Sequence, residues 1–392
     1  MRFLMILAGA LLAIWLVITA TARLAVREAL SKPWPAELGT LHTVPRRYPS
    51  HPTTTAARNL AELVSPAGIQ LGMKGEEVAL VPMSKELNNQ FTDYLYAQLQ
   101  RSDDSVTAPP TEIAATLRAH QQLLADVTRY VNESGSSIDW HDEIEAENRS
   151  YPPLEGIQRL SRLLAANALL KRDASSWDDL HAIVLLVRPL WHREDTYCVA
   201  RAISSARLAN GVARKLPPPV PPWWREVGDI DARHAVLAAY QGESWLWWKW
   251  SENWRRRMFV RSIVLSAAFD APLASFLNQR RGAAEAIAGS HDCAFDVDAW
   301  NKRWKGGRWN FMFESSRDSA NGAGTDFQRA AVFDFERSAA ERVMAIKEHR
   351  PLPAASRCSD GTWTYANNVL QFSKPIPIES PGRTAVPVRM RY

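Results

Sequence analysis

The sequence predicts a mainly helical protein with an apolar N-terminal transmembrane helix and a small C-terminal β element. Three observations support this fold class. The first is a series of helical hydrophobic periodicities joined by short loops, which is typical of stacked antiparallel helical hairpins. The second is the composition, with 18 glycines in 392 residues and abundant Ala, Leu and Arg, which favours helices. The third is apolar alternation around Asn367-Asn368, which indicates a β-hairpin.

Residues 1–22 are expected to form a membrane anchor. The run from Phe3 to Ala20 has 18 residues without a charge, which is just long enough to cross a bilayer as a helix. The expected partner is therefore the lipid bilayer around residues 3–20. The pattern Ala20-Thr21-Ala22 also fits a signal peptide cleaved after Ala22, and this alternative stays open.

The charges around this run bear on its orientation. Arg2 precedes it, whereas Arg23, Arg27 and Lys32 follow it, so a strict positive-inside count would keep the chain in the cytoplasm. The layout is nevertheless that of bacterial N-terminal anchors that export the chain behind them. We expect a single-pass protein of a bacterial inner membrane, with the bulk of the chain in the periplasm.

Changes in composition divide the rest of the chain into three parts. Residues 23–55 hold five prolines between Ser31 and Pro52 and are expected to form a stalk. Residues 56–350 are expected to be a helical domain, in which residues 111–131 form one long helix. Residues 351–392 are expected to form a β-hairpin or a three-stranded β element.

A proline-rich break at 215–224, "KLPPPVPPWW", interrupts the helical domain. Such a stretch is a ligand for SH3-type domains in signalling proteins. Beside a bacterial anchor we interpret it as a rigid spacer.

Tryptophans and cations are concentrated in one part of the helical domain. Between Glu243 and Arg308 the sequence holds 11 cations and 7 anions, and this excess nearly equals the net charge of +5 of the whole chain. Helical spacing puts Trp247, Trp250 and Trp254 on one stripe, which predicts that they pack against the core.

The remaining aromatic and basic side chains of this region form a candidate binding site. The candidate residues are Trp245, Trp248, Trp300, Trp304 and Arg308. Indole rings beside cations suit lipid headgroups, stacked sugar rings or single-stranded nucleic acid. The structural alternative is that arginines stack on tryptophans of the same chain. An envelope protein, a lipid surface or a glycan is the expected partner, and nucleic acid is not expected for an exported domain.

Motifs for catalysis or cofactor binding are not evident. The sequence has no HExxH, GxSxG, P-loop, GxGxxG or CxxC motif, so we predict no cofactor, no metal and no catalytic residue. Three polar clusters come nearest to a site. They are His141, Asp142, Glu143 and Glu145; His192, Glu194 and Asp195; and His291, Asp292, Cys293, Asp296 and Asp298. A solvated acidic loop explains the first better than a metal site, and helix capping explains the second. The third would need its cysteine and histidine apposed as a nucleophile pair, which side chains adjacent in sequence rarely are.

The three cysteines allow one disulfide. Cys293 and Cys358 lie in stretches rich in turn residues, whereas Cys198 lies in the apolar run "YCVARAI". We expect Cys293 and Cys358 to pair if the domain is exported, and Cys198 to be a buried thiol. The pairing would tie the β end to the tryptophan-rich helices.

The order of these parts resembles that of uncharacterised single-span bacterial envelope proteins with a helical-hairpin domain. The resemblance is carried by the layout, including the long helix "DFQRAAVFDFERSAAERVMAIKEHR" before the β end, and it implies no activity. We expect a membrane-anchored binding or scaffolding protein of the cell envelope. The alternative is an envelope hydrolase acting on cell-wall material, for which His141, His192 or His291 would have to meet carboxylates in a cleft.

Overall fold

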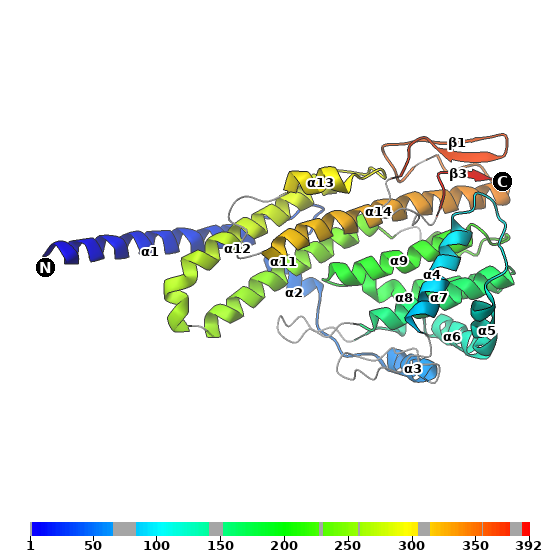
Figure 1. Cartoon of the computed structure of the whole chain (residues 1–392), viewed down its shortest axis with the longest axis horizontal. Coiled ribbons are helices and arrows are strands. Elements are labelled where there is room, and N and C mark those ends of the chain that lie inside the picture. The colour runs from blue at the N-terminus through cyan, green and yellow to red at the C-terminus, as the bar shows by residue number, and fades with distance from the viewer. Residues whose placement is uncertain are drawn as a thin grey trace.

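The computed structural model describes residues 2–65, 84–140, 152–226, 230–257, 259–304, 314–354, 356–376 and 386–392. It is mainly helical, with an apolar N-terminal helix and a three-stranded antiparallel sheet near the C-terminus, so the predicted fold class is confirmed (Figure 1). The helices are α1 (Arg2–Ser31), η1 (Leu41–Thr43), α2 (Val44–Arg47), α3 (Thr55–Val64), α4 (Lys85–Leu99), α5 (Thr111–Ala119), α6 (Gln121–Ser134), η3 (Gly135–Ser137), α7 (Leu154–Lys171), α8 (Ser176–Val187), η4 (Arg188–His192), α9 (Thr196–Ala213), α10 (Trp223–Glu226), α11 (Ala232–Arg257), α12 (Phe259–Ala288), α13 (Val297–Trp304) and α14 (Glu314–Lys347). The strands are β1 (Trp363–Ala366), β2 (Val369–Phe372) and β3 (Arg389–Arg391).

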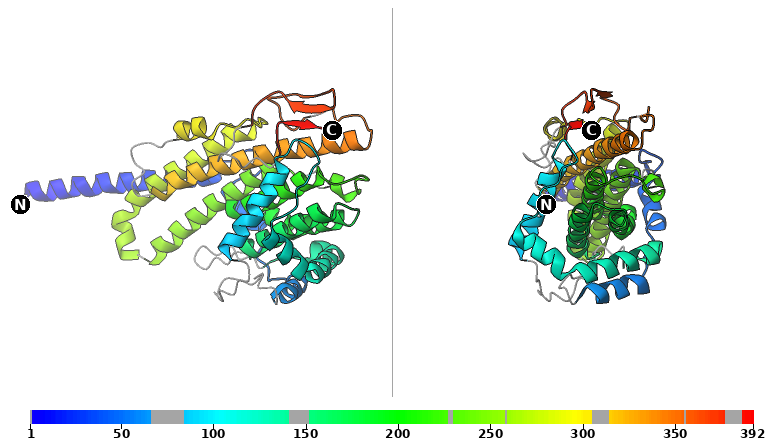
Figure 2. Two further views of the ribbon diagram at one scale, coloured as in Figure 1. Left: turned by 45° about the vertical axis from the view of Figure 1, so that its right-hand side comes forward. Right: turned by 90° about the vertical axis from the view of Figure 1, so that its right-hand side faces the viewer.

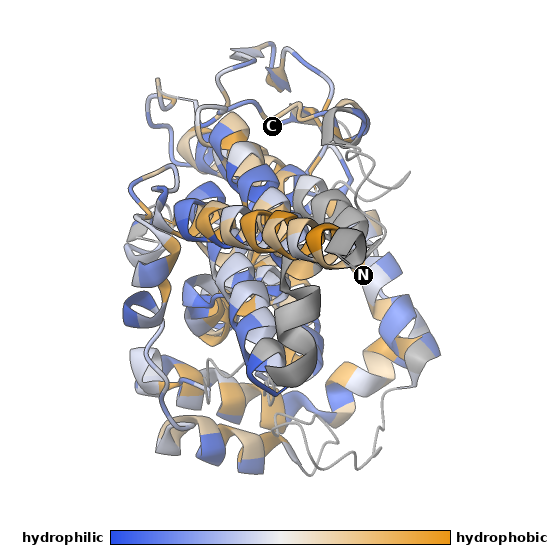
Figure 3. Cartoon of the chain, turned by 90° about the vertical axis from the view of Figure 1, so that its left-hand side faces the viewer, coloured by the Kyte–Doolittle hydropathy of each residue, from blue (hydrophilic) through white to orange (hydrophobic). Residues whose placement is uncertain are grey.

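Helix α1 projects from the body over its first half (Figure 1). By length and composition, its residues Met5–Ser31 can cross a membrane. Large apolar side chains between Met5 and Ile18 are exposed, and Figure 3 shows this projecting helix as predominantly hydrophobic. The second half packs against α12 and buries Ala22, Val26, Ala29 and Leu30.

The body is built around α7, α8 and α9, which pack against one another. Helix α14 lies on α9, α4 on α7, α6 on α8 and α3 on α6. In the end-on view of Figure 2, α3 to α6 curve around the central helices. Leu164, Leu186 and Val199 are completely buried at the centre of this arrangement. The apolar helix faces predicted from the sequence therefore pack together in one large core.

Helices α11 and α12 form a long antiparallel hairpin beside α14. The turn of this hairpin lies at the end of the body from which α1 projects, and the sheet lies at the other end (Figures 1 and 2). Aromatic contacts join the two helices: the ring centroids of Trp247 and Phe276 are 6.1 Å apart, and those of Trp254 and Phe269 are 4.6 Å apart.

The sheet has the strand order β1-β2-β3, with Ala366 opposite Val369 and Leu370 opposite Met390. Asn367 and Asn368 have φ angles of 52° and 59°, which a two-residue type I′ turn requires. The predicted hairpin and its third strand are therefore confirmed. The sheet packs on α14, where the rings of Phe335 and Trp363 stack at 5.3 Å.

A disulfide joins Cys293 and Cys358, the pair expected from the sequence, with their Cα atoms 5.2 Å apart. The Asp360 carboxylate accepts hydrogen bonds from the backbone N–H groups of Cys293 and Ala294, both at 3.0 Å. Cys198 is a buried free thiol. The bridge ties the segment between α12 and α13 to the segment that leads into β1.

The segment expected to be a free stalk, 23–55, is packed against the body, and this expectation is corrected. Helix α1 continues to Ser31, and Trp34, Leu38 and Leu41 are buried. The Trp34 ring lies edge-on to Tyr240 of α11, with centroids 6.2 Å apart. The few apolar residues between the prolines have partners far away in the sequence, which composition alone does not reveal.

The long helix expected over 111–131 is divided into α5 and α6. His120 separates them with φ −106° and ψ 11°, and its Nδ1 atom lies 2.8 Å from the Thr116 carbonyl oxygen. No proline or glycine marks this break. The proline-rich break at 215–224 does separate α9 from α10, and it lies against the body because Leu216 and Trp224 are buried.

Candidate functional site

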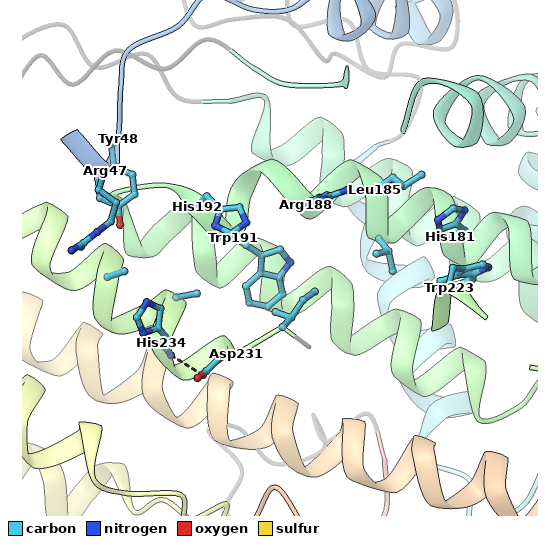
Figure 4. A pocket seen from close by; sticks show the side chains of 14 residues that line it. Arg47, Tyr48, His181, Leu185, Arg188, Trp191, His192, Trp223, Asp231 and His234 are labelled. Atoms are coloured by element: carbon cyan, nitrogen blue, oxygen red, sulfur yellow. Dashed lines mark hydrogen bonds between the residues drawn. The ribbon is translucent and has the colours of Figure 1, made fainter. Parts of the chain in front are cut away.

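A groove of about 680 Å³ opens between α8–η4, the first turns of α11, and α2 (Figure 4). Its volume lies within the range of small-molecule sites, roughly 300–1,000 Å³. The groove is therefore a candidate functional site among the described residues.

One wall comes from α8 and the 3-10 helix η4. His181, Leu185, Arg188 and His192 follow at intervals of three or four residues, so they share one face of this helical segment. Trp191 is 5% exposed and lies between the two walls (Figure 4). This wall therefore combines an apolar surface with imidazole and guanidinium groups.

The other wall is the beginning of α11, with Asp231, His234, Ala235 and Ala238. The Asp231 carboxylate accepts a hydrogen bond from the His234 backbone N–H at 2.9 Å, and its carbonyl accepts one from Ala235 at 3.0 Å. Asp231 is thus the residue that caps this helix. Its carboxylate is already engaged at the helix end, and the two alanines leave space in the groove.

Aromatic and basic side chains mark the two ends of the groove. At one end the Trp223 ring stacks on His181, with centroids 4.5 Å apart and an interplanar angle of 24°. At the other end Arg47 donates to Gln241 Oε1 at 2.5 Å and to the Leu38 carbonyl. These bonds hold the Arg47 guanidinium in a fixed position.

The groove carries more positive than negative charge. Arg47 and Arg188 are cations at all ordinary pH values, and Asp231 is the carboxylate among the residues that line it. Burial and the neighbouring Arg188 lower the pKa of His192 from the ordinary 6.5, against an opposing effect of Asp139. At neutral pH His192 is therefore uncharged and can both donate and accept hydrogen bonds. This combination suits an anionic ligand.

The described residues that line the groove include no Ser, Thr, Cys or Lys. The groups among them that could form a covalent intermediate are Tyr48, the Asp231 carboxylate and the imidazole rings. An enzyme is expected to bring His141, His192 or His291 together with carboxylates in a cleft. His192 and the Asp231 carboxylate do line the same groove, so this expectation is met in part. His291 is exposed and lies outside the lining of the groove, and His141 lies outside the described residues. Within the described ranges, no group of three or more His, Cys, Asp or Glu side chains could hold a metal ion.

The aromatic residues predicted to bind a partner are mostly inside the protein. Trp245 is 6% exposed and Trp300 is 7% exposed. Trp248 is half-buried and lies edge-on to His42, with centroids 5.9 Å apart. The side chain of Trp304 and the whole of Arg308 lie outside the described residues. Burial corrects the expectation that Trp245 and Trp300 offer ring faces to a surface ligand.

The predicted core stripe of α11 is also only partly correct. Trp247 and Trp254 are half-buried against α12, whereas Trp250 is 44% exposed. The reason is that this end of α11 extends beyond the central helices and packs along α12 (Figure 1). A helical wheel predicts which side chains share one face of a helix. It does not predict how far along the helix that face is covered by other elements.

Two of the polar clusters act largely as capping and turn residues. Asp195 caps α9 through the Tyr197 N–H at 2.5 Å, and Asp296 accepts from the Ala299 N–H at 2.9 Å near the start of α13. The cluster of His141, Asp142, Glu143 and Glu145 lies outside the described residues. His192 departs from the capping interpretation, because it lines the groove (Figure 4).

Sequence reasoning missed most of the groove. Arg47, Arg188 and His234 come from three separate segments that no sequence motif connects. One local signal was present: His181, Arg188 and His192 recur at helical spacing on an otherwise apolar helix.

No protein-family model, no curated protein and no solved structure matches this chain.

Proposed function

We propose that the protein is a single-pass membrane protein whose body binds a small anionic ligand with an apolar portion. The observation that carries this proposal is the groove, in which Arg47 and Arg188 flank an apolar surface containing Leu185 and Trp191. A guanidinium group binds carboxylate or phosphate oxygens with charge-assisted hydrogen bonds, and the apolar surface accepts an alkyl or aromatic group. The rival proposal of a cell-wall hydrolase is weaker, because the described lining offers no Ser, Thr, Cys or Lys nucleophile and Asp231 is the one carboxylate there, already engaged at the start of α11.

The proposed location is a bacterial inner membrane, with α1 as the anchor and the body in the periplasm. The uncovered apolar side chains between Met5 and Ile18 support the anchor. The Cys293–Cys358 disulfide supports an oxidising compartment such as the periplasm. Carbonate washing of membranes tests the anchor: the protein should stay in the membrane fraction. A soluble mature chain that begins at Arg23 would contradict it.

Calorimetric titration of the full chain in lipid nanodiscs tests the binding proposal. Hexyl phosphate should bind with saturation, whereas hexyltrimethylammonium, with the same alkyl chain and a positive charge, should not. Arg188→Gln should weaken hexyl phosphate binding by roughly ten- to a hundredfold, because a charge-assisted hydrogen bond contributes about 1.5–3 kcal/mol. Arg118→Gln on α5 is the matched control and should change nothing. Equal binding of both probes, or no effect of Arg188→Gln, would refute the proposal.

A further inference from the structure

We propose that the end of the α11–α12 hairpin is a second membrane contact, which binds anionic lipid headgroups beside α1. The contact consists of residues 247–257 of α11, here called the hairpin arm. The proposal rests on the membrane insertion of α1 proposed above, and it adds a lipid-binding surface that is separate from the groove.

The position of the hairpin arm follows from how α1 is attached. The second half of α1 packs along α12, where Val26, Ala29 and Leu30 are buried, so α12 cannot move freely relative to the anchor. The hairpin turns at the end of the body from which the exposed half of α1 projects (Figures 1 and 2). A bilayer around the exposed half of α1 would therefore have its surface next to this turn.

The aromatic side chains of the hairpin arm suit a membrane surface. Among the tryptophans whose side chains are described, only Trp250 is exposed, at 44%. Trp247 and Trp254 are half-buried, with one side of each ring against Phe276 and Phe269 of α12. Tryptophan is enriched at membrane–water interfaces because its ring is apolar and its N–H group is polar.

The charged side chains of the hairpin arm point to anionic rather than neutral lipid. Lys249 and Arg256 both bind Glu252, at 3.0 Å and 2.8 Å, and Arg257 is exposed beside them. Two cations thus share one carboxylate, which leaves an excess of positive charge in this cluster. Long basic side chains can extend to phosphate groups while their alkyl portions remain on apolar surface.

The sheet at the other end of the body provides a matched comparison. Arg389 and Arg391 are two exposed arginines on β3, and Thr364 is exposed on β1. This end carries the same kind of basic residue but lies away from the projecting half of α1 (Figure 1). Any effect that requires only positive charge should therefore appear equally at both ends.

A fluorescent probe on the full chain tests the contact. Cys198 is buried and Cys293 is disulfide-bonded, so a thiol introduced by Asn253→Cys on the hairpin arm can be labelled selectively. Thr364→Cys on β1 is the control site. Each labelled protein is reconstituted into vesicles of phosphatidylcholine alone or mixed with phosphatidylglycerol, with a headgroup spin label that quenches the probe. Retention of both proteins after carbonate washing shows that α1 is inserted, so a failure of the anchor is recognised separately.

The probe at Asn253 should be quenched strongly in the anionic vesicles and less in the neutral ones, and the probe at Thr364 should be quenched in neither. Replacing Arg256 and Arg257 by Gln should shift the equilibrium away from the contact by about fivefold for each cation removed. The matched replacement of Arg389 and Arg391 by Gln should leave the quenching unchanged. Equal quenching at both probes, or quenching at Asn253 that is the same in neutral and anionic vesicles, would overturn the proposal.

Discussion

Arg23 of α1 lies 3.9 Å from Asp270 of α12, whose side chain is completely buried. The junction between the projecting helix and the body therefore includes a charge contact in addition to the packing of Ala22 and Val26. A carboxylate buried at this position depends on neighbouring polar groups, because an uncompensated charge away from water is costly. The junction is thus specific, and it sets the orientation of the body relative to α1.

Arg23→Gln should destabilise the body by roughly 1 kcal/mol, a modest value because the Arg23 side chain is 56% exposed and solvent screens the pair. Denaturant unfolding of the full chain in detergent measures the change. Arg27→Gln, at an exposed position one turn further along α1, is the control and should have no effect. Equal stability of all three proteins would show that the contact contributes nothing.

The disulfide should be present in protein isolated from its native compartment. It closes a sequence separation of 65 residues, so the chain-entropy model assigns it about 4 kcal/mol of stabilisation. Replacing Cys293 and Cys358 together by Ala should lower the free energy of unfolding by up to that amount, whereas Cys198→Ala should not affect the bridge. Mass spectrometry that finds all three thiols free would contradict this prediction.

Lys215 should make stability depend on pH. Burial and the neighbouring Arg214 lower the pKa of Lys215 from 10.5 to about 7. Between these two values the unfolded chain binds more protons than the folded chain, so the free energy of unfolding rises with pH, by at most about 1.4 kcal/mol per pH unit. Lys215→Met should reduce the rise between about pH 7 and about pH 9, where the unfolded lysine is still protonated. Lys302→Met, at an exposed position, should leave the rise in the free energy of unfolding unchanged. A slope identical in both variants would contradict the assignment.

Gly242 allows α11 to approach the segment just before α9. A Cβ atom at this position would lie 2.5 Å from Glu194 Cβ and 2.6 Å from the Glu194 carbonyl oxygen. Gly242→Ala should therefore destabilise the protein by about 1–3 kcal/mol, and it should also disturb the groove through the neighbouring His192. Gly289→Ala, where no atom lies within 4 Å of the new Cβ, serves as the control for thermal unfolding. Equal melting temperatures for the two variants would contradict this account of Gly242.

Local features were predictable from the sequence, and long-range features were not. The turn at Asn367-Asn368 was predictable because two neighbouring residues that tolerate positive φ determine it. The packing of Trp34 on Tyr240 was not, because the two residues are far apart in the chain and prolines dominate the composition around Trp34.

The same distinction explains the candidate site. His181, Arg188 and His192 share one helix face and could be found by their spacing, but Arg47 and His234 join them only through the packing of α2 and α11. The burial of Trp245 and the exposure of Trp250 likewise depend on where the core ends along α11. These relationships are tertiary and leave no periodic signal in the sequence.

Histidine NMR of the full chain in nanodiscs tests the binding account most directly. The chain has nine histidines, and His→Gln variants assign the imidazole signals. During a titration with hexyl phosphate, the signals of His192 and His234 should shift along one saturating curve. The signals of His120 and His349, which do not line the groove, should stay constant. Shifts of similar size at all four rings, or no shift at His192 and His234, would contradict an anion-binding groove.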